Sequence, residues 1–109
     1  MPPGSHIVNI SSMGGFMGSQ KFPGLALYSM AKGAVSILSE ALAEELENRQ
    51  IRVNCLALGA VQTEMLEEAF HGYRAPVEPK DMAGFIAGFA LEAHYFINGK
   101  VIPVSLATP

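Results

Sequence analysis

The sequence predicts an α/β fold in which a parallel sheet of about three strands is flanked by helices. Three short apolar segments, at residues 6–12, 51–58 and 100–106, are typical of buried strands. Longer segments with apolar residues three and four positions apart separate them and indicate helices. Buried strands that alternate with amphipathic helices form parallel sheets through right-handed crossovers. At 109 residues, half of them apolar, the chain fits one domain, which we assign to residues 1–109.

The first predicted strand covers residues 6–12, HIVNISS, and ends in the serine pair Ser11 and Ser12. Residues 12–24, SMGGFMGSQKFPG, are rich in glycine and end in a Pro-Gly pair, which indicates a loop. The large apolar residues of this loop either line a substrate pocket or cover the core. They are Met13, Phe16 and Met17.

The first predicted helix covers residues 25–49. Its apolar residues recur at intervals of three and four and form one stripe. The stripe consists of Leu27, Ala31, Ala34, Val35, Leu38, Leu42 and Leu46. The C-terminal half also carries four acidic residues, against the preference of the helix dipole, so we expect them on a solvated face. They are Glu40, Glu44, Glu45 and Glu47.

The second predicted strand covers residues 51–58, IRVNCLAL, and is closed by Gly59. Cys55 lies inside this apolar run, so we expect a small core residue rather than a nucleophile. A short helix is expected over residues 63–70, followed by a linker with two prolines over residues 73–79.

The next helix is expected over residues 80–93, with Asp81 as its N-terminal cap. An Asn-Gly pair at residues 98–99 indicates a turn before the last strand, residues 100–106. Pro103 lies inside this strand. Because proline has no N–H group for the sheet, we expect the strand at an edge or at a bulge.

Composition excludes several classes of function. The net charge is −3 and no run of Lys or Arg occurs, so nucleic acid and anionic membrane are not expected as partners. No window reaches the ~18 uncharged apolar residues of a transmembrane helix, and the first residues do not resemble a signal peptide. A single cysteine cannot form an internal disulfide, which fits the reducing cytoplasm. The three histidines share no ligand spacing, so we expect no metal site.

Tyr28 and Lys32, in the segment LALYSMAKGA, form the first candidate for chemistry. Residues four apart on a helix share a face, so the two side chains project together. A free tyrosine has a pKa of about 10, and a nearby ammonium lowers it by favouring the phenolate. The pair is therefore suited to general acid–base catalysis, although a Y-x-x-x-K spacing arises by chance in about one such chain in ten.

Further polar groups follow the two buried strands at their carboxyl ends, where open α/β sheets bind their ligands. Ser11 and Ser12 close the first strand, and either hydroxyl could hydrogen-bond a substrate oxygen. Gly59, at the end of the second strand, would let backbone approach a ligand, and Thr63 adds a hydroxyl. We expect these groups and Tyr28 to meet at one edge of the sheet.

In four of its segments the chain resembles the C-terminal half of a short-chain dehydrogenase/reductase. HIVNISS resembles the fifth strand of that family with its catalytic serine, and YSMAKGA resembles its Y-x-x-x-K helix. IRVNCLALGAVQTEM resembles its sixth strand and P-G-x-x-x-T segment, and INGKVIPV resembles its final strand. The likeness runs from about residue 4 to the end and implies a partial Rossmann-like sheet.

The resemblance implies a role for each matching residue. Ser12, which closes the strand motif, would polarise the substrate oxygen, and Tyr28 would donate or accept the proton. Lys32 would support Tyr28 and hydrogen-bond the nicotinamide ribose. The nicotinamide end of the cofactor would contact Gly59, Val61 and Thr63.

Three departures from the family pattern stand beside this assignment. Leu58 replaces the proline expected before Gly59, and the spacing from Ser12 to Tyr28 is enlarged. The glycine-rich dinucleotide loop of the family's first half is absent. The glycines of the serine-to-tyrosine loop do not replace it, because they lack the first glycine, the adjoining helix and the acidic residue of that fingerprint. They are Gly14, Gly15 and Gly18.

Two hypotheses of different class follow. In the first, the chain belongs to an NAD- or NADP-dependent oxidoreductase that moves a hydride between nicotinamide and a small carbonyl or alcohol substrate. In the second, it is a non-catalytic fragment or interaction module that cannot bind the dinucleotide alone. The family resemblance also implies a subunit interface on the helix over residues 25–49. With the apolar first strand at a sheet edge, we expect a homo-oligomer or a partner that supplies the missing first half.

Overall fold

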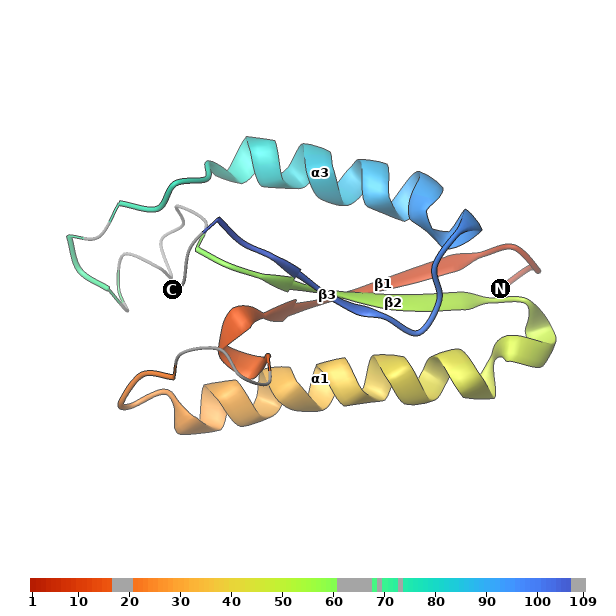
Figure 1. Cartoon of the computed structure of the whole chain (residues 1–109), viewed down its shortest axis with the longest axis horizontal. Helices are drawn as coiled ribbons and strands as arrows, with labels where there is room; N and C mark the ends of the chain where they lie inside the picture. Colours follow the sequence, from red (N-terminus) through yellow and green to blue (C-terminus); the bar gives the residue numbers. More distant parts are fainter. Residues whose placement is uncertain (17–20, 61–67, 69, 73, 107–109) are drawn as a thin grey trace.

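The computed structural model describes residues 1–16, 21–60, 68, 70–72 and 74–106, and it places a parallel sheet between two helices (Figure 1). Within these residues the sheet has three strands in the order β1-β2-β3, and both pairs are parallel. The main elements in chain order are β1 (His6–Ser12), α1 (Ala26–Glu45), β2 (Arg52–Leu58), α3 (Pro79–Glu92) and β3 (Val101–Val104). The predicted α/β fold is therefore confirmed.

Three short 3-10 turns adjoin these elements: η1 (Met13–Gly15), η2 (Glu47–Arg49) and η3 (Ala93–Tyr95). The single helix predicted over residues 25–49 is thus divided into α1 and η2. Gln50 ends η2 in the left-handed conformation, with φ of 57°, and turns the chain into β2.

Register determines which side chains face which helix. His6 of β1 lies opposite Arg52 of β2, and Ser12 lies opposite Leu58. Side chains alternate between the two faces of a sheet, so even-numbered residues of both strands share one face. His6 bonds to α3 and Ser11 bonds to α1, so even-numbered residues face α3 and odd-numbered residues face α1.

Small residues bring α1 close to the sheet. Its buried residues are Ser36, Ser39 and Ala43. The Ser39 hydroxyl accepts a hydrogen bond from Asn9 Nδ2 at 2.9 Å and donates to the carbonyl of Val35 at 2.8 Å. Each buried hydroxyl thus has a partner, as burial of polar groups requires.

The apolar stripe predicted for α1 is not the face that the helix buries against the sheet. Leu27 is 77% exposed and Leu38 is 53% exposed, and Ile37, outside that stripe, is 67% exposed. The helix packs through Ser36 and Ala43 instead, because small side chains permit the closest approach to the strands. Most of the bulky apolar side chains of α1 are left on its outer face. The four glutamates are exposed, as predicted.

The centre of the sheet is β2, where Val53, Cys55 and Leu56 are fully buried. Cys55 is a free core thiol, as predicted. β3 pairs only with β2 among the described strands, so the edge position expected from Pro103 is confirmed. At the predicted turn, Gly99 adopts a positive φ of 71°.

Several predicted boundaries need correction. β2 begins at Arg52, one residue later than predicted, and β3 ends at Val104 rather than at residue 106. α3 starts at Pro79, and its N-cap is Glu78 without a side-chain cap bond, so Asp81 is not the cap but a first-turn residue. The helix expected over residues 63–70 lies almost wholly outside the described residues. No helix in the described ranges is long and apolar enough to cross a bilayer.

Candidate active site

The serine pair at the end of β1 is divided between two roles. Ser11 is buried, and its hydroxyl donates to the carbonyl of Lys32 at 2.7 Å. Ser12 is half-buried, and its Oγ accepts a hydrogen bond from the backbone N–H of Gly14 at 3.1 Å. Ser11 is therefore committed to the α1 backbone, whereas Ser12 caps the turn η1 at the carboxyl end of the sheet.

Tyr28 and Lys32 lie together on the first turns of α1, as their spacing predicts. Lys32 Nζ lies 5.8 Å from the centroid of the Tyr28 ring. Tyr28 is 37% exposed, and Lys32 is half-buried. The positive charge thus lies over the Tyr28 ring, within the range of a cation–π contact.

The turn η1 brings Ser12 and Tyr28 to the same glycine, Gly14. A Cβ atom added to Gly14 would lie 3.5 Å from both Ser12 Oγ and Tyr28 Cε2. Ser29 Oγ lies 3.5 Å from the same point. Ser12 and Tyr28, which are sixteen positions apart in the sequence, therefore meet around one glycine. Ser29 was not singled out from the sequence, and its only signal there is its position directly after Tyr28.

A backbone contact holds η1 against α1. A Cβ atom on Gly15 would lie 2.5 Å from the Gly33 nitrogen and 2.6 Å from the Lys32 carbonyl carbon, so no side chain fits there. Ser11, directly before Ser12, bonds to the Lys32 carbonyl, and Gly15, after Ser12, packs against the Lys32 backbone. Ser12 is therefore positioned relative to α1 from both directions along the chain. Gly15 therefore serves helix–turn packing, whereas an added Cβ at Gly14 would make only ordinary contacts, and Gly18 lies outside the described residues.

Gly59 packs against the end of β3 and the residue after it. Its backbone N–H donates to the carbonyl of Val104 at 2.8 Å, and an added Cβ would overlap the side chain of Ser105. Gly59 therefore has a structural reason of its own, the close approach of Ser105 directly after β3, and its approach to a ligand stays a prediction. Gly59 still follows Leu58, which lies opposite Ser12, so it belongs to the same edge of the sheet. Val61 and Thr63 lie outside the described residues.

No group of three or more His, Cys, Asp or Glu side chains suited to a metal ion occurs in the part of the chain that the structure describes. The candidate catalytic groups at this edge are the Ser12 hydroxyl, the Tyr28 phenol and the Lys32 ammonium. This set can polarise an oxygen and move a proton.

Comparison with known proteins identifies relatives. Residues 2–74 match the sequence family described as short chain dehydrogenase. Dehydrogenase/reductase SDR family member 4 of Rattus norvegicus is 33% identical over 97% of this chain and 41% of its own length. The 3-oxoacyl-[acyl-carrier-protein] reductase FabG of Chlamydia trachomatis is 44% identical over 90% of this chain and 42% of its own length. The chain thus spans less than half the length of these relatives.

Solved structures agree with the sequence matches. A mutant of the Serratia marcescens short-chain dehydrogenase/reductase superposes with a TM-score of 0.77 at 29% identity, over 95% of this chain and 45% of that one. A 4-hydroxyisoleucine dehydrogenase complexed with NADH gives 0.68 at 27% identity, over 91% and 44%. BdcA in complex with NADPH gives 0.76 at 25% identity, over 95% and 46%. On this fold and this family match, the chain belongs to the short-chain dehydrogenase/reductase family.

Proposed function

We propose that this chain carries the acid–base residues of an NAD(P)-dependent oxidoreductase that interconverts a small alcohol and the corresponding carbonyl compound. The observation that carries the proposal is the meeting of Ser12 and Tyr28 around Gly14, with the Lys32 ammonium 5.8 Å from the Tyr28 ring. The three residues match the family's catalytic positions, and they lie at the carboxyl end of β1, where parallel sheets bind ligands.

Each residue has one role in the proposed reaction. The Ser12 hydroxyl donates a hydrogen bond to the substrate oxygen and polarises it. The Tyr28 hydroxyl gives a proton to that oxygen when a carbonyl is reduced, and it takes the proton back when an alcohol is oxidised. Lys32 stabilises the negative charge that Tyr28 carries after giving up its proton. The nicotinamide cofactor, when bound, supplies or accepts the hydride at the substrate carbon.

The described residues fit the nicotinamide end of such a cofactor and not its adenine end. Tyr28, Lys32 and Gly59 lie at one edge of the sheet, and we assign the hydrogen bond to the ribose hydroxyl to Lys32 by its place in the family motif. We assign Val61 and Thr63 to the nicotinamide end by their place in the family motif. The sequence contains no glycine-rich dinucleotide fingerprint, so NAD and NADP are both retained as cofactors.

The alternative is a non-catalytic fragment or interaction module, and one observation favours it. β1 pairs only with β2 among the described strands, so its other side presents unpaired backbone groups. Under this alternative, the 109 residues need another polypeptide or a second copy to complete the sheet. The free, buried Cys55 suits a reducing compartment such as the cytoplasm under either function.

Cofactor binding and turnover decide between the two functions. NADH and NADPH fluorescence titrations of the purified chain should show saturable binding if the chain is the enzyme. Nicotinamide absorbance would then report turnover with a panel of small ketones and aldehydes. An absence of binding of either dinucleotide at millimolar concentration would favour the fragment.

The matched variants are Tyr28→Phe and Tyr95→Phe. Tyr28→Phe removes the proton donor with little change in volume, so we expect turnover to be lost while cofactor affinity stays nearly unchanged. Tyr95 is 71% exposed and lies in η3, away from the serine and lysine, so its variant should keep full turnover. Turnover retained in Tyr28→Phe would contradict the acid–base assignment.

A further inference from the structure

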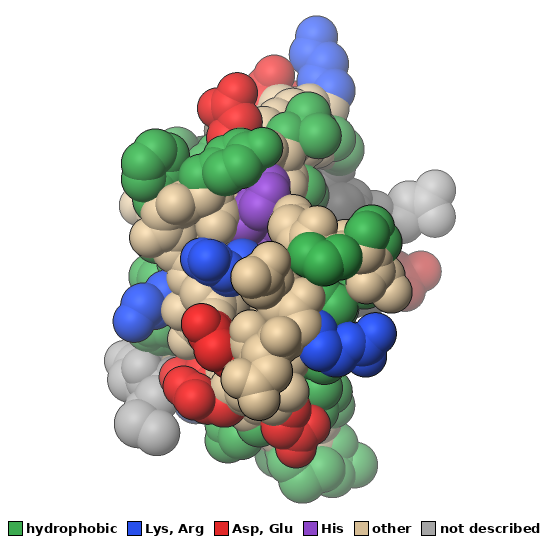
Figure 2. All heavy atoms as spheres, turned by 90° about the vertical axis from the view of Figure 1, so that its right-hand side faces the viewer, with side chains coloured by type: hydrophobic (Ala, Val, Ile, Leu, Met, Phe, Trp, Pro, Cys, Tyr) green, Lys and Arg blue, Asp and Glu red, His purple; other side chains and the backbone are tan. Residues whose placement is uncertain are grey.

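Two histidines gather at the amino ends of the strands, opposite the candidate active site. His6 begins β1, and His94 lies in η3. Their rings stack with centroids 4.7 Å apart, and the ring of Tyr95 stacks on His94 at 4.4 Å. Figure 2 shows this end of the molecule, where histidine atoms reach the surface between hydrophobic side chains and a Lys or Arg.

Asn54, at the centre of this cluster, has a fixed orientation. It is fully buried in β2. Its Oδ1 accepts a hydrogen bond from the N–H of Lys100 at 3.0 Å, and its Nδ2 donates to the carbonyl of Ile97 at 3.0 Å. Exchanging the oxygen and nitrogen of this amide would break both bonds, so Nδ2 is the atom that faces His6, at 3.0 Å.

The orientation of Asn54 determines the protonation of His6. An amide nitrogen can only donate, so His6 Nε2 must accept and carries no proton. His6 Nδ1 lies 3.0 Å from the carbonyl of Ala90, which can only accept, so Nδ1 carries the proton. Both nitrogens of the neutral ring are therefore satisfied, and a second proton on Nε2 would point at the N–H group of Asn54.

We propose that His6, Asn54 and His94 form an acid-sensitive latch. While His6 is neutral, the latch holds the end of α3 and the turn η3 against β1 and β2. When His6 takes a second proton, its bond to Asn54 becomes a contact between two donors, and η3 separates from the sheet together with His94.

The surroundings of the latch also disfavour a second proton on His6. Burial lowers the pKa of His6, and the neighbouring His94 lowers it further. The hydrogen bond to Ala90 raises the pKa but does not fully offset the effect of burial. From β2, Arg52 lies opposite His6 in register and its Nη1 contacts the carbonyl of His94 at 3.5 Å. From α3 the ring of Phe89 faces His6 at 5.7 Å, and Tyr95 adds only a neutral phenol. Among the described residues, no carboxylate hydrogen-bonds to either imidazole.

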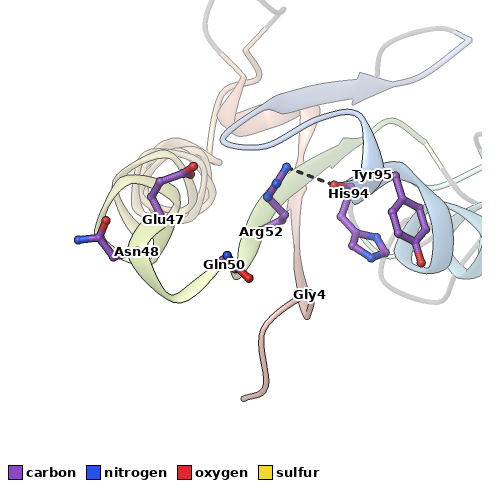
Figure 3. A pocket seen from close by; sticks show the side chains of 7 residues that line it. All are labelled: Gly4, Glu47, Asn48, Gln50, Arg52, His94 and Tyr95. Atoms are coloured by element: carbon purple, nitrogen blue, oxygen red, sulfur yellow. Dashed lines mark hydrogen bonds between the residues drawn. The ribbon is translucent and has the colours of Figure 1, made fainter.

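The latch also forms one wall of an open polar hollow. His94 and Tyr95 line it on one side, and Glu47 and Gln50 line it on the other, with Arg52 between them (Figure 3). Glu47 is the one acidic residue of this lining, and it faces the latch across the hollow rather than contacting it. Release of η3 would therefore widen the hollow at the side of the histidines.

The sign of the pH dependence follows from linkage. The pKa of His6 is lower in the folded chain than the value of about 6.5 in the unfolded chain. The unfolded chain therefore binds more protons below that value, and stability falls as the pH is lowered through it. Each unit by which the pKa is depressed allows about a tenfold loss in the ratio of folded to unfolded chain.

Nuclear magnetic resonance of the 109-residue chain tests the latch directly. Long-range nitrogen–proton spectra should show His6 as the Nδ1–H tautomer at pH 7.5, and a pH series should show it titrating below the ordinary histidine value of about 6.5. Amide exchange at Phe96 and Ile97, both bonded to the carbonyl of Ala93, should be faster at pH 5.5 than at pH 7.5 when each rate is divided by the intrinsic rate at that pH. An Nε2–H tautomer, or titration of His6 at or above about 6.5, would overturn the proposal.

Two variants separate the latch from general acid sensitivity. His6→Gln can donate to Ala90 and accept from Asn54 without titrating, so it should abolish the extra exchange at pH 5.5. His71→Gln, as the matched control, should keep it. Equal acceleration in wild type and His6→Gln would also overturn the proposal, and the wild-type tautomer decides the matter if His6→Gln fails to fold.

Discussion

At the residue scale, adjacent serines perform different tasks because Ser11 still points from the sheet toward α1, whereas Ser12 is the N-cap of η1, where the chain leaves the strand. Ser11 faces α1 and bonds to the Lys32 carbonyl, while Ser12 turns toward Gly14 and Tyr28. The motif alone does not distinguish the two hydroxyls. The preference for Ser12 came from the family motif, and the geometry supports it, because the hydroxyl of Ser11 is already engaged.

Substitution of the two serines separates catalysis from stability. Ser12→Ala should lower kcat by about 10²-fold or more, because it removes one hydrogen bond to the substrate oxygen in the transition state. Ser11→Ala should instead lower the free energy of unfolding by about 1 kcal/mol, through loss of its bond to Lys32. Steady-state kinetics and urea unfolding of both variants give the comparison. A large loss of kcat in Ser11→Ala alone would mean that the catalytic assignment is off by one residue.

At the element scale, the site depends on how closely η1 approaches α1. Gly15 lies against the backbone of Lys32 and Gly33 with no room for a Cβ atom. The contact is a property of two elements, since neither η1 nor α1 requires glycine at this point for its own geometry. It holds the residues after Ser12 against the helix that carries Tyr28.

Gly15→Ala should therefore damage both stability and the site. We expect a loss of about 1–3 kcal/mol in the free energy of unfolding, typical of overpacking, because backbone atoms must move apart. Gly84→Ala is the matched control: Gly84 lies in α3 with nothing near an added Cβ, so alanine should raise stability by about 0.5–1 kcal/mol. Urea unfolding measures both changes. Equal effects of the two substitutions would show that η1 does not depend on this contact.

At the scale of the whole molecule, much apolar surface is left uncovered. On the outer face of α1, Leu27, Met30 and Ile37 are each more than 60% exposed. At the edge strand β1, Ile10 is 40% exposed. Exposed apolar patches and unpaired strand edges are both typical sites of association.

We therefore predict that the chain self-associates or binds a polypeptide that completes the sheet. Analytical ultracentrifugation at micromolar concentration should show species larger than the 11.6 kDa monomer. Ile37→Glu should dissociate them if the outer face of α1 is the interface, and Ile10→Lys should do so if the edge of β1 is. A stable monomer with cooperative unfolding would contradict self-association.

The sequence alone was sufficient for the order of the main elements and for the proximity of two residues of the candidate site. Strand and helix periodicities are local, so β1, α1, β2, α3 and β3 were predicted within a few residues. The meeting of Tyr28 and Lys32 follows from their spacing of four on one helix. The edge position of β3 could be inferred from Pro103, because the missing N–H group is a property of that residue.

Only the tertiary structure decided the features that depend on close approach between distant segments. The spacing of the bulky apolar residues predicted the wrong buried face of α1, because the helix packs on the sheet through small residues such as Ser36 and Ala43. Gly59 is required by Ser105, and His6 Nε2 lies 3.0 Å from Nδ2 of Asn54, 48 residues away. Periodicity reports which residues are apolar along one element. It does not report which atoms of another element lie within 3 Å, and those atoms decide the role of a glycine, a serine or a histidine.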